Sequence, residues 1–282
     1  MNRGLGPEEI VLFAQAACLF EVSAPKPGNV TRHHHFHDTR FEDFLLSAAA
    51  IGPAFHDVLE TGVGNTVLRA VRDTRRVVHV NTNLGMILLL APLARAAGQT
   101  RGTLRERLGD VLRALTVADA RAVYEAIRLV APGGLGRADA QDVSREPTLT
   151  LREAMSLAAA RDQVASEYVT SYEVTFARAL PALRAARQDG LAWPTAIVEA
   201  FLAVLAAVPD TLIARKEGPV VARQVSERAR EVLAAGKAGS DARARATAAF
   251  DAELRGPGNR LNPGTTADLL AAATFVALAE EL

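Results

Sequence analysis

Polar segments containing glycine or proline interrupt a chain otherwise rich in Ala, Leu and Arg, and these segments carry the side chains that could do chemistry. The longest, residues 23–32, places Lys26 and Asn29 around Gly28, with Glu21 just before it. Prolines fix φ and glycine reaches angles that other residues avoid, so we expect a stiff loop. Lys26 could bind a phosphate as a point charge. Alternatively, Glu21 and Lys26 form a surface ion pair of little value.

A histidine cluster follows this loop and comprises His33, His34, His35 and His37, with Asp38 next to it. Neutral imidazoles are common ligands for transition metals. Adjacent histidines on an irregular loop do not by themselves define a metal site, so the sequence favours a solvated loop. Asp38 is the better candidate for a contact with Mg²⁺ or with a hydroxyl group.

The amide-rich segment Asn81, Thr82 and Asn83 precedes an apolar stretch that begins at Met86. Asn81 or Thr82 could cap a helix that starts there. A helix N-terminus also binds phosphate, because its free N–H groups and dipole favour negative charge. Capping and ligand binding are compatible here, and the sequence leaves both open.

A glycine-rich segment contains Gly133, Gly134 and Gly136 beside Arg137, and Asp142 follows it. Three glycines and an arginine resemble a phosphate cradle. No strand precedes them, however, so the segment fits neither a P-loop nor a dinucleotide-binding fingerprint. It is a weak signal for phosphate binding.

Acidic residues interrupt the next apolar pattern at Asp162 and Glu167. Buried carboxylates usually need a partner or a cation, so these residues either face a site or lie on a solvated surface.

Two segments near the C-terminus combine polar groups in the same way. Asp210 precedes Arg215 and Lys216 by five and six residues, a spacing that could put the acid on Mg²⁺ or a sugar hydroxyl and Arg215 on a phosphate. Asn262 opens a Pro-Gly turn, and Asp268 lies one turn inside the helix expected after it. Asp268 is therefore either a partner of the helix dipole or a ligand group. Each polar segment could also be only a helix connection, although several exceed the usual ~2–8 residues.

The elements that must position these residues are all helical. Apolar residues recur three and four positions apart, Ala is abundant, and strand-like alternation is scarce. We expect an all-α, compact single domain over residues 1–282 with roughly ten or more helices. The expected helices cover residues 7–22, 41–60, 65–78, 82–97, 103–114, 116–130, 149–187 (with a break near Pro181), 193–208, 217–235, 241–255 and 265–281.

Composition restricts the class of partner. Lys plus Arg and Asp plus Glu both number 32, and aromatics make up 5%, so we expect no nucleic-acid partner. The apolar run from Met86 to Ala94 is much shorter than the roughly 20 residues that span a bilayer, so we expect no membrane partner. Cys18 is the only cysteine, which excludes an intramolecular disulfide. Glu8 and Glu9 interrupt any signal-peptide pattern, and the cytoplasm is the expected compartment.

In their order and spacing, these segments resemble the triphosphoribosyl-dephospho-CoA synthase family, whose enzymes serve prosthetic-group biosynthesis. The resemblance covers nearly the whole chain. It is carried by Glu21 with Lys26-Pro27-Gly28, by Asp38 and the stretch from Phe41 to Pro53, by Asn81-Thr82 and Gly85, by Asp210 with Arg215, and by Asn262-Pro263-Gly264 with Ala267-Asp268-Leu269.

The resemblance implies that the 5-triphosphoribosyl group of ATP moves to the 2′-hydroxyl of 3′-dephospho-CoA and that adenine leaves. Such pentosyl transfer builds positive charge at the anomeric carbon, so carboxylates near that carbon and a proton donor for adenine would help. ATP would bring Mg²⁺. The implied catalytic residues are Glu21, Asp38, Asp210 and Asp268; the implied metal ligands are Asp142, Asp162 and Asp210; the implied substrate-binding residues are Lys26, Gly28, Asn29, Asn81, Thr82, Asn83, Gly133, Gly134, Arg137, Arg215, Lys216 and Asn262.

One departure from the family pattern affects the acceptor. Asn83-Leu84 occupies the places where a His-Lys pair is expected after Asn81-Thr82, so one basic contact is absent. An alternative hypothesis is therefore a paralogue that transfers a ribosyl-phosphate group to another cofactor precursor, for example a pterin or one-carbon cofactor. A non-catalytic helical ligand-binding protein is a third hypothesis, and a homodimer is a further expectation.

Overall fold

The last helix, α16 (Gly264–Glu281), runs through the middle of the molecule. The computed structural model describes residues 3–130 and 141–281, and within them every regular element is helical. From Thr265 to Leu278, every residue of α16 except Asp268 is buried. A helix that is apolar on all sides belongs in a core. The single polar interruption therefore marks a special position.

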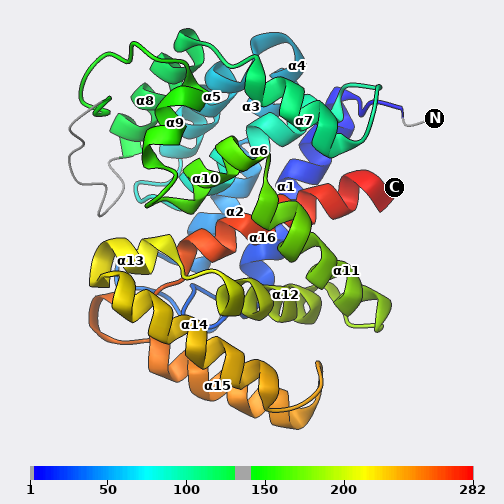
Figure 1. The fold of residues 1–282 in the computed structure, drawn as a ribbon, viewed down its shortest axis with the longest axis vertical. Coiled ribbons are helices and arrows are strands. Elements are labelled where there is room, and N and C mark those ends of the chain that lie inside the picture. The colour runs from blue at the N-terminus through cyan, green and yellow to red at the C-terminus, as the bar shows by residue number, and fades with distance from the viewer. Residues whose placement is uncertain (1–2, 131–140, 282) are drawn as a thin grey trace.

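Two groups of helices enclose α16, as Figure 1 shows. On one side lie α2 (Phe41–Ala50), α3 (Gly52–His56), α4 (Val58–Thr61), α5 (Val63–Arg75), α6 (Leu84–Ala97), α7 (Leu104–Arg113), α8 (Val117–Val130), α9 (Leu151–Ala158) and α10 (Gln163–Thr170). On the other lie α12 (Trp193–Ala207), α13 (Thr211–Glu217), α14 (Pro219–Ala234) and α15 (Asp241–Leu254), with α11 (Leu180–Gln188) at one end. α1 (Pro7–Ser23) packs along α16, as do α6 and α12, and one continuous apolar core joins both groups.

Local sequence explains where several helices begin. α7 and α9 start with capping boxes, in which Thr103 pairs with Glu106 and Thr150 with Glu153. Asp162 caps α10 through the Ala165 N–H at 3.1 Å. These side chains satisfy backbone donors that the first helical turn leaves free.

Pro92 lies inside α6 and cannot donate to the carbonyl of Leu88, four residues earlier. The hydroxyl of Tyr168 replaces that donor at 2.7 Å, and the hydroxyl of Tyr172 donates to the Leu89 carbonyl at 2.9 Å. Both tyrosines are fully buried. They tie the region around α10 to the middle of α6.

The loop after α1 is held on α15. Gly28, at φ 73°, donates its N–H to Asp251 Oδ1 at 2.8 Å, and Arg255 donates to the Asn29 carbonyl at 2.8 Å. A side chain on Gly28 would meet Leu254 Cβ at 2.9 Å. The expectation of a stiff loop agrees with this docking, and Gly28 is needed both for its φ and for the close approach of α15.

The all-α class and the compact body are confirmed, but two helix predictions were wrong and one short helix was missed. The stretch 41–60 is divided among α2, α3 and α4, with Pro53 in the first turn of α3. The stretch 149–187 is broken after α9 and after α10, where Ser171 and Tyr172 have positive φ, and not at Pro181, which lies in the first turn of α11 after the π-helical turn η1 (Thr175–Ala179). The short helix α13 was not predicted as a separate element.

Candidate active site

A cavity of about 320 Å³ opens between the two groups of helices. Its lining includes residues of α1, the loop after it, α2, α6, α8, α9, α10, α13 and the start of α16. The charged residues in the lining are Glu21, Asp142, Arg161, Asp162, Arg215 and Asp268. Four carboxylates and two guanidinium groups therefore face one space.

Asp268 projects from α16 against the first turn of α6. Its carboxylate forms no hydrogen bond or ion pair with any residue that the structure describes, and it lies directly over Gly85. Burial raises the pKa of Asp268 well above its ordinary value, and the negative charges of Glu21, Asp210 and Asp162 raise it further, while Arg215 opposes the rise. Such a shift favours the protonated form of the carboxyl group.

Glu21 lies behind this position on α1. Lys26 Nζ is 2.9 Å from Glu21 Oε1, and both side chains are buried. The two residues therefore do form an ion pair, but the alternative that placed this pair on the surface is wrong. Lys26 also donates to the carbonyls of Glu21 and Ala24. Glu21 Oε2 has no hydrogen-bond partner among the described residues. Burial raises the pKa of Glu21, and the Lys26 ammonium opposes that rise. Glu21 lines the cavity, whereas Lys26 does not.

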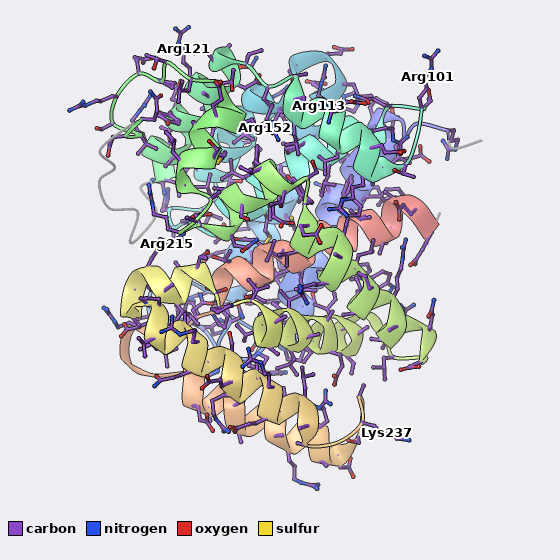
Figure 2. The ribbon with its side chains drawn as sticks, viewed as in Figure 1. Arg101, Arg113, Arg121, Arg152, Arg215 and Lys237 are labelled. Carbon is purple, nitrogen blue, oxygen red and sulfur yellow. The ribbon has the colours of Figure 1, made fainter. Side chains whose placement is uncertain are left out.

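Arg215 extends from α13 (Figure 2). Its guanidinium group pairs with Asp162 Oδ2 in the segment before α10. Both side chains are about three-quarters buried, and Arg215 Nε has no hydrogen-bond partner in the described part of the chain. Arg161, next to Asp162, donates to the Leu157 carbonyl at 3.3 Å and forms no ion pair within residues 3–130 and 141–281. The two guanidinium groups make this edge of the cavity suitable for a phosphate chain.

The amide segment before α6 divides between two environments. Asn81 and Thr82 line the cavity, and Thr82 Oγ1 lies 2.5 Å from Ser47 Oγ. Asn83 does not line it, because its amide donates inward to Thr74 Oγ1 at 3.3 Å. The next residue, Leu84, lines the cavity instead, so this part of the lining has no positively charged side chain.

Asn29 and Asn262 also reach the cavity from two loops. The Asn29 amide donates to the Pro27 carbonyl at 3.2 Å. Asn262 Oδ1 is buried and has no partner among the described residues. This oxygen could accept a hydrogen bond from a bound ligand.

Asp210 is fully buried and does not line this cavity. Its Oδ1 accepts the N–H groups of Leu212 and Ile213, and its Oδ2 accepts both the N–H and the hydroxyl of Thr266 at 2.7 and 2.8 Å. The residue thus joins the starts of α13 and α16. This geometry suits a positioning role and offers no free oxygen to a metal.

Lys216 and Asp38 lie outside the lining as well. Burial lowers the pKa of Lys216. The negative charge of Asp210 raises that pKa, whereas the positive charges of Arg215 and Arg260 lower it further. Asp38 accepts the Thr39 hydroxyl at 2.9 Å and lies 3.7 Å from His37. The histidine cluster forms no metal-holding group, and within the described part of the chain no three His, Cys, Asp or Glu side chains are placed to hold a metal ion without other ligands.

Asp142 lines the cavity and accepts the N–H and hydroxyl of Ser144 at 2.9 and 2.6 Å. Tyr124 lies nearby and donates its hydroxyl to the Gln141 carbonyl at 2.7 Å. The predicted cradle of Gly133, Gly134 and Arg137 lies outside the described residues.

Sequence reasoning missed the apolar wall of the cavity. It is formed by side chains of α8, α9 and α10, among them Val123, Ile127, Leu151, Met155 and Val164. The only signal was their helical spacing, which also describes ordinary core residues. Arg161, which also lines the cavity, was not predicted as a site residue either.

No single helix in the described residues is long and apolar enough to span a membrane. The bent pair α12 and α13 meets the length and composition test only when the two are taken together.

Comparisons with known proteins agree on one family. The family model for ATP:dephospho-CoA triphosphoribosyl transferase matches residues 7–282. The chain is 27% identical over 278 residues to 2-(5″-triphosphoribosyl)-3′-dephosphocoenzyme-A synthase of Klebsiella pneumoniae, covering 93% of this chain and 91% of that protein. It is 28% identical over 269 residues to a protein of Stutzerimonas stutzeri (strain A1501) whose name gives the same activity as probable, covering 90% and 85%.

A crystal structure from Archaeoglobus fulgidus, provisionally named a triphosphoribosyl-dephospho-CoA synthase, is similar at a TM-score of 0.64 and 29% identity. The similarity covers 84% of this chain and 98% of that one.

Proposed function

Because the chain belongs to the ATP:dephospho-CoA triphosphoribosyl transferase family, we propose that this transferase moves the 5-triphosphoribosyl group of ATP to the 2′-hydroxyl of 3′-dephospho-CoA and releases adenine. The observation that carries the site assignment is Asp268, a desolvated carboxyl group without a hydrogen-bond partner in the described structure, on the wall of a cavity edged by arginines.

The bond between the anomeric carbon and the adenine nitrogen breaks, and its electron pair leaves with adenine. The acceptor hydroxyl oxygen forms the new bond to the same carbon and loses its proton to a carboxylate of the lining. Adenine gains one proton, so the protons balance over the reaction. The transition state carries positive charge on the ribosyl group, which the ionised carboxylates of the lining would stabilise.

Asp268 is the proposed donor of adenine's proton. A general acid must hold its proton at the working pH, and burial together with the charge of Glu21 favours the protonated form of Asp268. Glu21 is kept in place by Lys26 and acts on Asp268 through its charge.

Arg215 and Arg161 are the proposed contacts of the triphosphate. Guanidinium groups bind phosphate oxygens with two parallel hydrogen bonds, and Arg215 Nε has no partner among the described residues. A phosphate that binds Arg215 in place of Asp162 would leave the Asp162 carboxylate without its present ion-pair partner.

The residues fit a magnesium ion only together with the nucleotide. Mg²⁺ usually keeps one or two protein carboxylates and takes its other ligands from phosphates and water. Asp162, which pairs with Arg215, and Asp142 both line the cavity and would hold it, whereas all the acceptor positions of Asp210 point to helix starts. When bound, the ion would neutralise the triphosphate, which otherwise meets more carboxylates than guanidinium groups.

The apolar wall of α8 and α9 is the part of the cavity suited to a flat base or to the apolar arm of the acceptor. The hypotheses of a paralogue with another acceptor and of a non-catalytic binding protein gain no support from the family match, which extends over residues 7–282.

The test is adenine release from ATP with Mg²⁺, measured with and without 3′-dephospho-CoA, followed by the mass of the acceptor product. Adenine release that depends on the acceptor, with a mass gain equal to one triphosphoribosyl group, supports the proposal. ATP binding without this product contradicts it. An arm with a chelator tests the requirement for Mg²⁺.

A further inference from the structure

Gly85 and Asp268 meet where the first turn of α6 touches the first turns of α16. A β-carbon on Gly85 would lie 2.0 Å from Asp268 Oδ2 and 2.5 Å from its Cγ. Real β-carbons do not approach other atoms so closely, so any side chain on residue 85 would displace the carboxylate.

The backbone at this position does not itself call for glycine. Gly85 lies within α6 and is not among the glycines with positive φ. Alanine is favoured over glycine inside a helix. Glycine is therefore needed at position 85 because the Asp268 carboxylate occupies the space that a β-carbon would take.

The packing of both helices opposes a shift that would make that space. Met86 and Ile87 of α6 are buried, as are Ala267 and Leu269 of α16, and the two helices pack on each other. A clash would thus be relieved by rotation of the Asp268 side chain, which no hydrogen bond within the described residues holds in place.

We infer that Gly85 is the positioning residue for Asp268: its missing side chain lets the carboxylate rest against α6 at the cavity wall. The catalytic importance of where the Asp268 carboxylate lies rests on the proposed function. The contact between Gly85 and Asp268 is independent of that function.

The variant Gly85→Ala tests this inference, with Gly256→Ala as the matched control. Gly256 has an extended backbone conformation, and a β-carbon there would meet nothing within 4 Å. Gly85→Ala is expected to lower kcat about 100-fold, as a misplacement of about 1 Å does, with a much smaller change in KM for ATP. Gly256→Ala is expected to match the wild type.

Two readouts separate positioning from a purely structural effect. Displacement toward the open cavity rehydrates Asp268 and lowers its pKa, so the decline of kcat at alkaline pH should begin at a lower pH in Gly85→Ala. In an Asp268→Ala background, where the clash is gone, Gly85→Ala should raise the melting temperature, whereas in the wild-type background it should not.

Wild-type kcat in Gly85→Ala would overturn the inference, as would an unshifted pH profile or the same effect on melting temperature in both backgrounds. If the wild-type protein itself gives no triphosphoribosyl transfer, the proposed function fails, and the melting-temperature comparison still decides whether Gly85 makes room for Asp268.

Discussion

Lys26 Nζ lies 2.9 Å from Glu21 Oε1, and the two side chains are only 1% and 3% exposed. An ion pair removed from water in this way is costly to break, because the charge that remains has no solvent to stabilise it. The pair joins the end of α1 to the loop that carries Asn29 and places Glu21 at the cavity wall.

Replacing Lys26 by methionine should therefore lower the free energy of unfolding by about 3–5 kcal/mol, since it leaves Glu21 buried and unpaired. The double variant Glu21→Gln with Lys26→Met should recover much of that loss. Urea denaturation at pH 7 measures both. Arg76→Met, which breaks an exposed pair with Asp73, is the control and should cost less than about 1 kcal/mol. Equal costs at the two sites would contradict the burial of the pair.

Arg215→Gln should weaken ATP binding by about 10- to 100-fold, because a charge-assisted hydrogen bond contributes about 1.5–3 kcal/mol. Isothermal titration calorimetry without the acceptor measures this.

Asp162→Asn should strengthen ATP binding in the absence of Mg²⁺, since it removes the anion that now pairs with Arg215, and asparagine can still cap α10. Arg184→Gln, in a surface pair with Glu280, is the control. Unchanged affinity in Arg215→Gln would remove Arg215 from the phosphate site.

Tyr168→Phe should destabilise the protein by about 1–3 kcal/mol, because the Leu88 carbonyl loses the donor that replaces the missing N–H of Pro92. In a Pro92→Ala background the backbone supplies its own donor, so the cost of Tyr168→Phe should fall. Thermal or urea unfolding of the four proteins gives the comparison. Identical costs in both backgrounds would show that the two donors do not compensate for each other.

Asp268→Asn should change how stability depends on pH. The folded pKa of Asp268 is raised, so the folded state binds its proton more tightly than the unfolded chain does. The stability advantage of protonation is complete below the ordinary carboxyl pKa and is lost as pH rises toward the raised value. Asp268→Asn should therefore equal the wild type near pH 4 and become more stable than it as pH increases. A difference that does not vary with pH would contradict the raised pKa.

The sequence predicted most helices because their apolar spacing and caps are local signals. Breaks set by tertiary contacts were not predictable in this way: Ser171 and Tyr172 have positive φ although neither is glycine, and Pro181 begins a helix where a break was expected. The seven residues of α13 are too few for a clear period.

For the site, residue type indicated which side chains matter but not which way they face. Asp268 and Arg215 line the cavity, whereas Asp210 and Asn83 form hydrogen bonds inside the protein. Direction depends on packing partners far away in the chain, such as Thr266 for Asp210, and no local pattern encodes them.

The most direct test of the central claim is the rate of acceptor-dependent adenine release by Asp268→Asn beside the wild type. Asparagine matches the shape of the carboxyl group but cannot serve as the acid, so kcat should fall by roughly 10²–10⁴-fold while the fold and ATP binding persist. A rate within about threefold of the wild type, with the variant folded, would contradict the assignment of Asp268 and of this cavity as the site of ribosyl transfer.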